Sequence, residues 1–553
     1  MATTINNILR DATTDYLATQ VRSNPPLPRD IEEELLKNIK HDIQSENAIR
    51  VNAKEPKLSV PSTLAPVQIA EIIAYFHPVY CIMTGGEGAD RSNDLLGLYQ
   101  SQGPNQGIYV IDDETIRSLI RQYNYTINSK EIDECISVLR EIVPRKMLCT
   151  DQNLIAVNNG IFDYDTKQLM PFDPKYIFMS KSRVNYVQHP LNPVIHNDDD
   201  GTDWNVESWM NELSDDPEVV NLLWEILGAI IRPNVPWDKS AWFYSESGNN
   251  GKGTLCELMR NLCGKGSFAS IPLADMGKDF ALEPLTRSSA IIVDENDVGT
   301  FIDKAANVKA IITGDAIGIN RKFKTAIAFV YHGFMVQCLN EMPRVKDKSD
   351  SFFRRQLFIP FTKCFTGKER KYIKHEYLHR EDVLQYVLWR VLNMNYYTLS
   401  EPAACKQALA EYKEYNDPVR QFAQDILEEA RWTLLPTTLL YQAFQKWTEK
   451  NNPAGKDKIM GRNTFFNEFQ KVLKDYPEWA WADNKGGCDK KIKGEGCMEV
   501  YEPLLEKYEL KEWMNPKYVS KFTATVEDRC TPAPGQYTTL YYRGAYRVIA
   551  EEG

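Results

Sequence analysis

Short apolar runs punctuate the middle of the chain, and polar residues able to do chemistry flank each of them. Residues 241–244, 290–293, 333–339 and 352–361 each contain a predicted strand. The run at 290–293 has no polar alternation, which is typical of a strand buried on both faces of a parallel sheet. Leucine and methionine recur on one face of a helix predicted over residues 255–262. The pattern therefore predicts an α/β domain.

A glycine-rich loop, Ser-Glu-Ser-Gly-Asn-Asn-Gly-Lys-Gly-Thr at residues 245–254, joins the first strand to that helix. Such a loop cradles nucleotide phosphates with backbone N–H groups, and its lysine reaches the β/γ oxygens. It departs from the general pattern G-x-x-x-x-G-K-[ST], because Glu246 takes the first glycine position and Gly253 follows the lysine. A surface turn is the alternative interpretation. The candidate nucleotide-binding residues are Gly248, Asn249, Asn250, Gly251, Lys252, Gly253 and Thr254.

Two carboxylates, Asp294 and Glu295, end the second predicted strand, where open α/β sheets place their ligands. One carboxylate can hold Mg²⁺ through water while the next polarises the attacking water. An ordinary acidic turn is the alternative. Because Gly253 stands where the pattern has a hydroxyl, either Thr254 supplies that Mg²⁺ ligand or the ligand is absent.

Polar side chains also adjoin the third and fourth predicted strands. Asn340 ends the third strand, and its amide can orient water against a γ-phosphate. Arg354 and Arg355 precede the fourth strand. Arginine stabilises the charge of a transferring phosphoryl group, from the same subunit or from a neighbour.

A basic stretch with the spacing K-x4-G-x7-K lies at residues 309–324, between the second and third strands. Its cations follow a turn that contains Gly314 and surround an aromatic ring, so they offer phosphate contacts beside a stacking surface. A solvated basic hairpin is the alternative. The candidate DNA-binding residues are Lys309, Arg321, Lys322, Phe323 and Lys324.

These motifs, taken in this order, resemble the helicase domain of superfamily 3. Within it they resemble the phage/plasmid primase–helicase family that is shared with poxviral and satellite-phage replication proteins. The resemblance covers roughly residues 95–500. It implies an AAA+-like P-loop ATPase core that uses ATP and Mg²⁺, forms a homo-hexameric ring, and grips DNA with a β-hairpin facing a central channel.

The resemblance also implies roles for the nucleotide-site residues. Lys252 would bind the β/γ-phosphates, and Thr254 together with Asp294 would hold Mg²⁺. Glu295 would activate the attacking water, and Asn340 would sense the γ-phosphate.

Further roles follow for residues that act between subunits or on DNA. Arg354 of the adjacent subunit would be the arginine finger, with Arg355 as the second choice. Lys309 would support the hairpin, while Lys322 and Lys324 would pull one DNA strand through the ring.

The chain divides into six predicted segments. In order, they are a helical arm (1–60), a non-catalytic α/β domain (61–200), a helical collar (201–235), the ATPase core (236–415), a winged-helix-like domain (416–505) and a small appendage (506–553).

The α/β domain before the core carries one acidic pair that invites a primase interpretation. Residues 96–99 and 107–111 predict paired strands, and residues 153–164 predict a strand–Asn-Gly–strand hairpin. Asp112 and Asp113 are adjacent, so in a strand they would face opposite ways. As acids at a helix start they need no catalytic role.

Flanking segments are predicted to be mainly helical. Residues 204–233 predict two amphipathic helices, which are either a ring collar or a plain core pair, and residues 196–203 predict a loop. Beyond the core, three helices and a basic hairpin suggest a winged helix, which reads duplex DNA or docks a protein. These elements lie at residues 419–427, 439–447, 463–473 and 485–494.

Composition and charge limit the class of protein. The 553 residues are 43% hydrophobic and carry a net charge of -11, which argues against indiscriminate coating of nucleic acid but not against a local basic channel. The eleven cysteines contain no C-x-x-C pair, which favours reduced thiols. No signal pattern or membrane-spanning run is present, so we expect a cytoplasmic protein of a host cell, encoded by a phage or mobile element.

The sequence thus predicts an ATP-driven replicative helicase that acts on single-stranded and forked DNA, 3′→5′ by resemblance. Origin duplex DNA bound through the C-terminal domain, and a primase or polymerase, are expected further partners. Three alternatives remain: an origin-binding initiator, a bifunctional primase–helicase, and a structural or packaging ATPase. The K-x4-G-x7-K stretch disfavours the last of these.

Overall fold

A parallel sheet of five strands carries the motif residues, in the order β11-β12-β16-β10-β18. The strands are β10 (Ser240–Tyr244), β11 (Phe268–Ala269), β12 (Ala290–Val293), β16 (Phe334–Leu339) and β18 (Gln356–Pro360). All four predicted strands are present, and β11 is an addition. β10 and β16 are neighbours, yet the chain leaves them toward opposite edges of the sheet, to β11 and β18 respectively. Such a reversal leaves a ligand crevice at the carboxyl ends of the two strands.

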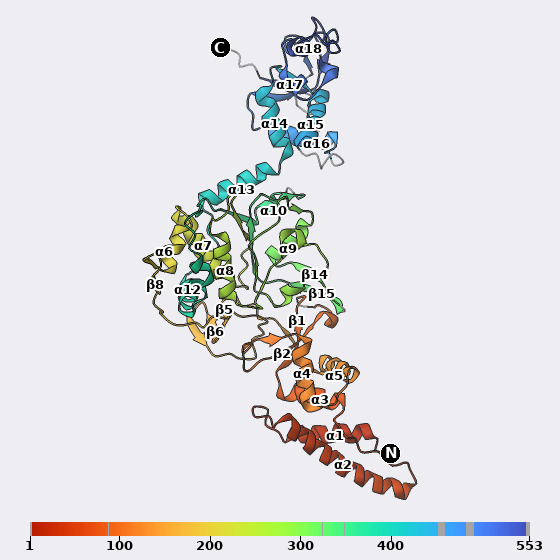
Figure 1. Cartoon of the computed structure of the whole chain (residues 1–553). Coiled ribbons are helices and arrows are strands. Elements are labelled where there is room, and N and C mark those ends of the chain that lie inside the picture. Colours follow the sequence, from red (N-terminus) through yellow and green to blue (C-terminus); the bar gives the residue numbers. More distant parts are fainter. Residues whose placement is uncertain are drawn as a thin grey trace. The chain divides into compact units, whose positions relative to one another are not determined.

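The computed structural model describes residues 3–86, 88–322, 324–347, 349–451, 459–482 and 491–548. The chain forms two compact units, Met1–Leu409 and Ala410–Gly553, each with its own core. Figure 1 shows the first in red to green and the second in blue. Among the described residues, no helix is long and apolar enough to cross a membrane.

One face of the sheet is covered by a helical layer, visible in Figure 1. It consists of α6 (Val206–Glu212), α7 (Pro217–Ala229), α8 (Lys252–Cys263) and α12 (Glu381–Asn393). The predicted pair of helices is confirmed as α6 and α7. Ten of the thirteen residues of α7, at positions 219–220 and 222–229, are buried in the core of this unit. The helix pair is therefore part of the core of this unit.

The N-terminal region is a second α/β layer within the first unit. A four-stranded sheet has the order β3-β2-β1-β4, with β1 (Val79–Met83), β2 (Leu95–Tyr99), β3 (Tyr109–Val110) and β4 (Arg145–Met147). Its helices are α1 (Ile5–Ala18), α2 (Pro28–Ala53), α3 (Pro66–Phe76), α4 (Asp113–Tyr123) and α5 (Ser129–Ile142). The predicted pairing of residues 96–99 with 107–111 is confirmed by β2 and β3.

The first 60 residues pack more closely than the sequence suggests. The helical arm predicted over residues 1–60 consists of two helices, α1 and the longer α2. Isoleucine and leucine recur every four residues along α2, so they form one apolar stripe. The stripe residues Ile31, Leu35, Ile39 and Ile43 are each 0% exposed. The arm is thus joined to the core of the α/β layer rather than loosely attached.

Two short hairpins link this layer to the main sheet. The predicted strand–Asn-Gly–strand hairpin is confirmed by β5 (Leu154–Val157) and β6 (Gly160–Asp163), which β7 (Gln168–Met170) extends. The loop predicted over residues 196–203 is partly wrong, because β8 (Ile195–Asn197) and β9 (Thr202–Trp204) pair across it.

The second unit has an aromatic core made by three helices. The predicted helices are confirmed as α14 (Pro418–Glu429), α15 (Thr437–Asn451) and α16 (Arg462–Leu473). Phe465 of α16 lies between rings of the other two helices, with centroids 5.8 Å from Phe422 and 4.4 Å from Phe444. Most of the predicted basic hairpin at residues 485–494 lies outside the described residues.

The described part of the predicted appendage, residues 506–548, shares the core of this unit. It supplies β23 (Gly544–Arg547), the central strand of a sheet with β19 (Leu434–Pro436) and β20 (Trp479–Ala482). β22 (Tyr541–Tyr542) pairs with β21 (Ile492–Lys493). Local sequence patterns do not predict this association, because Ala545 of β23 pairs with Leu435 and Trp481, which lie far back in the chain.

Candidate functional site

The glycine-rich loop runs from β10 into the N-terminus of α8, as predicted. Gly251 is the N-cap of α8 and has φ 88°, a left-handed conformation that favours glycine. A Cβ atom at Gly251 would lie 2.7 Å from Cδ2 of Leu213, so that side chain would have to shift to admit one. Backbone N–H groups in the first turn of α8 lack partners within the helix and carry partial positive charge.

Lys252 is the best-defined residue of the loop. Its side chain is buried, and Nζ donates to the carbonyl oxygens of Ser245 at 3.2 Å and Leu339 at 2.9 Å, and to Oδ1 of Asn340 at 3.0 Å. Burial lowers the pKa of Lys252, because low dielectric disfavours the ammonium. The structure thus brings together two predicted site residues, Lys252 and Asn340, in the crevice between β10 and β16.

Asp294 and Glu295 are exposed after β12. Arg260, in the third turn of α8, binds the Asp294 carboxylate with Nη2–Oδ1 at 2.9 Å. This ion pair lowers the pKa of Asp294, chiefly through the hydrogen bond from Arg260. Arg260 was not among the predicted site residues. It lies one helical turn after Cys256, so the two residues share one face of α8. A cation that binds Asp294 must compete with this guanidinium.

The oxygen donors expected for Mg²⁺ are of the right chemical kind. Among the described residues, no cluster of three or more His, Cys, Asp or Glu side chains is placed to hold a metal. Nucleotide-bound Mg²⁺ needs fewer protein ligands, because phosphate oxygens and water complete its shell. Thr254 lies in the first turn of α8 and lines a cleft beside the glycine-rich loop. Its hydroxyl and the Asp294 carboxylate are therefore of the kind that could supply the few protein ligands of such an ion.

A buried asparagine that the sequence analysis missed supports the acidic pair. Nδ2 of Asn296 donates to Oε1 of Gln337 and to the carbonyl of Cys338, both at 3.0 Å. Its Oδ1 accepts from the backbone N–H of Leu273 at 2.9 Å. These bonds tie the exit of β12 to β16, so they fix where Asp294 leaves the sheet.

The predicted arginine finger lies at the opposite end of the sheet from Lys252. β18 runs parallel to β10 with Gln356 beside Ser240, and Arg354 precedes Gln356. The glycine-rich loop follows Tyr244, at the other end of β10. A strand of this length separates the two ends by about 15 Å. Arg354 therefore lies away from the phosphate loop of its own chain.

The two candidate arginine fingers differ in the exposure and the hydrogen bonding of their side chains. Arg354 is exposed. Arg355 is half-buried, and its Nη1 donates to the backbone carbonyl of Ser351 and, at 2.7 Å, to the hydroxyl of the same residue. The exposed Arg354 is thus better placed to reach a second molecule.

The basic stretch forms the predicted β-hairpin, and a helix that was not predicted precedes it. Its elements are α9 (Ala305–Thr313), β14 (Ala316–Arg321) and β15 (Lys324–Val330). Lys309 lies on α9 and bonds Oδ2 of Asp347 at 2.7 Å. Partial burial raises the pKa of Asp347, but hydrogen bonds from Lys309 and Ser349 outweigh it, and the pKa falls to about 2. Lys309 thereby joins α9 to the loop that follows β17 (Arg344–Val345).

The hairpin tip is partly engaged by the chain itself. Arg321 folds back so that Nε and Nη2 donate to the carbonyl of Thr325, at 3.1 and 2.9 Å. Lys324 Nζ lies 2.8 Å from Oδ2 of Asp113 at the start of α4. Lys322 is exposed, and Phe323 lies outside the described residues.

The hairpin rests on a loop of the N-terminal layer, residues 84–94. The N–H of Val330 donates to the carbonyl of Thr84 at 2.9 Å, and the N–H of Ala328 donates to Oδ1 of Asn93 at 3.2 Å. A Cβ atom at Gly85 would lie 3.3 Å from the carbonyl oxygen of Ala328, so loop and hairpin approach closely.

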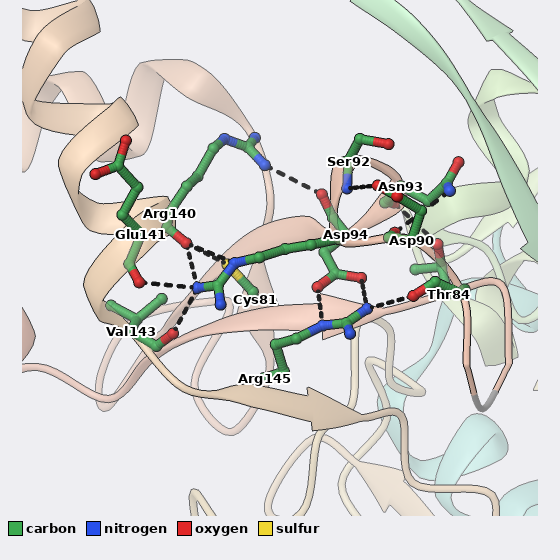
Figure 2. A network of polar contacts seen from close by, with 12 residues as sticks. Cys81, Thr84, Asp90, Ser92, Asn93, Asp94, Arg140, Glu141, Val143 and Arg145 are labelled. Carbon is green, nitrogen blue, oxygen red and sulfur yellow. Dashed lines mark hydrogen bonds and ion pairs between the residues drawn. The ribbon is translucent and has the colours of Figure 1, made fainter.

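Figure 2 shows the hydrogen bonds and the ion pair that hold this loop in place. The side chain of Asp94 is 1% exposed and receives Nε and Nη2 of Arg145 at 2.6 and 2.9 Å. Arg140 donates to the Asp94 carbonyl at 3.1 Å, and Arg91 donates to the last carbonyls of α5. Asp94 thus fixes the surface against which the hairpin lies.

Comparisons with known proteins agree with these elements. Residues 22–215 match a family model described as D5 N terminal like, and residues 414–513 match one described as Poxvirus D5 protein-like. Residues 243–355 match a family of unknown function. Two of the three matching models are thus of D5 type, which supports the resemblance of this chain to the D5-type primase–helicases.

Individual relatives are distant. The chain is 24% identical over 411 residues to “Putative helicase L207/L206” of Acanthamoeba polyphaga mimivirus, which covers 67% of this chain and 41% of that protein. The chain therefore spans about two fifths of that relative's length. A solved apo structure of the NrS-1 C-terminal region has 14% identity and a TM-score of 0.40, covering 75% of this chain and 88% of that one. A TM-score this low supports no conclusion about the family or the function of this chain.

Proposed function

We propose that the chain is an ATP-hydrolysing DNA helicase for replication of a phage, plasmid or other mobile element. The contact that carries this proposal is the bond from buried Lys252 to Asn340 at the crevice between β10 and β16. A lysine at the N-terminus of a helix that follows a glycine-rich loop is the group that binds β/γ-phosphates in P-loop ATPases. The sheet order, with β10 between β16 and β18, supports an AAA+-like P-loop core.

Nucleotide binding would rearrange the bonds of Lys252. Its ammonium donates hydrogen bonds to two carbonyl oxygens and one amide oxygen. Phosphate oxygens carry more charge and would replace some of these acceptors. Asn340 would then be free to orient water against the γ-phosphate. Nucleotide binding would thus change the hydrogen-bond partners of Lys252 and, through it, of Asn340.

Hydrolysis needs a base and a means to stabilise phosphoryl charge. Glu295, exposed beside Asp294, would orient and deprotonate the attacking water. Mg²⁺, held by Thr254 and Asp294, would neutralise phosphate charge. Arg354 would complete the site from a neighbouring subunit, since about 15 Å of strand separates it from its own loop. This arrangement favours a ring, a homo-hexamer by family resemblance.

The hairpin would be the DNA contact of the motor. Lys322 and Lys324 lie at its tip, and such cations bind phosphates with little dependence on sequence. Nucleotide-driven movement of six hairpins would draw one strand through the channel, 3′→5′ by resemblance. Forked DNA, a primase and a polymerase would be the partners.

A second candidate function, origin binding, rests on α16. The residues on its outer face, Arg462, Asn463, Thr464 and Asn467, are exposed, while Phe465 and Phe469 anchor the helix from behind. Arginine and asparagine are the side chains that read base edges in the major groove. The unit would then act as a winged helix, with protein docking as the alternative.

A primase activity finds little support. The side chain of Asp112 caps α4 by accepting from the N–H of Thr115 at 2.8 Å, and Asp113 pairs with Lys324. Both carboxylates of the suspected acidic pair are thus engaged in structural contacts.

The decisive experiment is strand displacement on a forked duplex with ATP, comparing substrates with a 3′ or a 5′ single-stranded tail. Unwinding from the 3′ tail that is lost in Lys252→Ala would support the motor. ATP hydrolysis without unwinding on either tail would contradict the helicase proposal and would favour the origin-binding function, which a footprint on one duplex site would test.

A further inference from the structure

We infer that Lys374 is a second phosphate-binding cation of the nucleotide site, contributed from beyond the last strand of the sheet. The inference rests on the proposed function and adds a residue that the motifs do not predict. It comes from a basic segment, residues 363–375, that the helicase motifs leave without a role.

Hydrogen bonds join residues 363–375 to the glycine-rich loop. The N–H of Phe365 donates to the carbonyl of Asn249 at 2.7 Å. In return, Nδ2 of Asn249 donates to Oγ1 of Thr366 at 3.3 Å and to Oε1 of Glu369 at 3.1 Å. Asn249 has φ 52°, which turns the loop toward the segment. The two elements therefore form the walls of one cleft.

The cleft has room for part of a nucleotide. Its volume is about 320 Å³, and its lining includes Asn250, Gly253 and Thr254 from the loop side and Lys374 from the other. α11 (Lys371–His375) carries Lys374 to the start of α8. A Cβ atom at Gly253 would lie 3.7 Å from Nζ of Lys374, so the ammonium sits beside the free N–H groups of the first turn of α8.

Two other cations of the segment, unlike the exposed Lys368 and Lys371, have acidic partners. Lys363 pairs with Asp215, and Arg370 pairs with Glu212. Lys374, half-buried, makes no hydrogen bond or ion pair with any residue in the described ranges. Its charge does reach the site, since it helps lower the pKa of Asp294 after the larger effect of Arg260. An unpaired ammonium beside a helix N-terminus adds to the positive potential there, and both favour binding of an anion such as phosphate.

Gly253 explains why this lysine would matter. The general phosphate-loop pattern has a serine or threonine after its lysine, whose hydroxyl binds Mg²⁺. Glycine removes that hydroxyl and also the side chain that would stand next to Lys374. Positive charge from Lys374 would therefore replace part of the phosphate neutralisation that a fully bound Mg²⁺ gives elsewhere. The ligand class is a nucleoside di- or triphosphate.

The test is the affinity of the full-length protein for N-methylanthraniloyl derivatives of ATP, ADP and AMP, followed by fluorescence. Lys374→Met should weaken ATP binding about tenfold, as expected for one charge-assisted hydrogen bond, and should affect AMP less. Lys374→Arg should retain most of the affinity. Lys406→Met, at an exposed position on α13 (Ala403–Tyr415), makes the same charge change away from the cleft and should bind like wild type.

A further variant tests the link to Gly253. In Lys374→Met, adding Gly253→Thr should recover part of the ATP affinity with Mg²⁺ present but none with EDTA. Wild-type affinity in Lys374→Met, alongside lost binding in Lys252→Ala, would overturn the inference and leave the proposed function intact. Absence of nucleotide binding by the wild-type protein would overturn both.

Discussion

The ammonium of Lys252 lies 3.0 Å from the amide oxygen of Asn340, although 88 positions separate the two residues in the chain. The bond joins the end of β16 to the first turn of α8. In the proposed mechanism, an anion in the crevice between β10 and β16 would compete with Asn340 for this lysine. Four predictions follow from this and three other contacts.

Lys252→Ala should abolish ATP hydrolysis, because it removes the cation that contacts the β/γ-phosphates. Asn340→Ala should keep ATP binding within about threefold of wild type and reduce turnover at least a hundredfold, since a residue that orients water acts mainly on the chemical step. Single-turnover hydrolysis and equilibrium binding separate the two effects. Equal losses of binding in both variants would remove Asn340 from a sensing role.

Arg354→Ala should lose hydrolysis while retaining ATP affinity, because Arg354 lies at the far end of the sheet from its own phosphate loop. Removal of an arginine finger costs roughly 10³-fold or more in turnover. Mixing this variant with Lys252→Ala should restore some activity, since neighbouring subunits can then form a complete site. Arg355→Ala is the matched control and should mainly alter stability, given its bonds to Ser351. No rescue on mixing would contradict action between subunits.

Asp113→Asn should strengthen binding of single-stranded DNA, because it releases the Lys324 ammonium from an ion pair at 2.8 Å. We expect about a threefold gain in affinity at low salt and a steeper salt dependence, since one further cation becomes available to phosphates. Adding Lys324→Ala should cancel the gain.

A matched loss-of-charge variant tests the hairpin itself. Lys322→Ala with Lys324→Ala should flatten the salt dependence and uncouple unwinding from ATP hydrolysis. Fluorescence anisotropy with a labelled oligonucleotide measures the binding effects of both hairpin variants. Unchanged unwinding in the double variant would exclude the hairpin as the motor contact.

Asp347→Asn should destabilise the first unit by about 1 kcal/mol near neutral pH, because it removes the half-buried partner of Lys309. The folded pKa of Asp347 is about 2, below the usual 3.8. A lowered carboxyl pKa gives stability that is complete above the unfolded value and is lost as pH falls toward the folded one. The difference between variant and wild type should therefore be constant above about pH 5 and shrink below pH 4. Urea unfolding across that range measures it.

Much of the candidate site could be predicted because its elements are local in sequence. A strand, a glycine-rich loop and a helix follow one another within residues 240–263, so propensity and spacing suffice to place Gly251 and Lys252. The same holds for Asp294 and Glu295 at the end of an apolar run. Each of these residues owes its position to neighbours a few places away.

Partners from distant segments could not be predicted in this way. Arg260 on Asp294, Asp113 on Lys324 and Lys374 beside Gly253 depend on how separate elements pack, and no periodicity encodes such pairs. The sequence by itself determined the class of chemistry, because motif residues act through their types and spacing. Only the tertiary structure decided which charges are already neutralised and which remain to bind a ligand, because electrostatic pairing depends on distance in space.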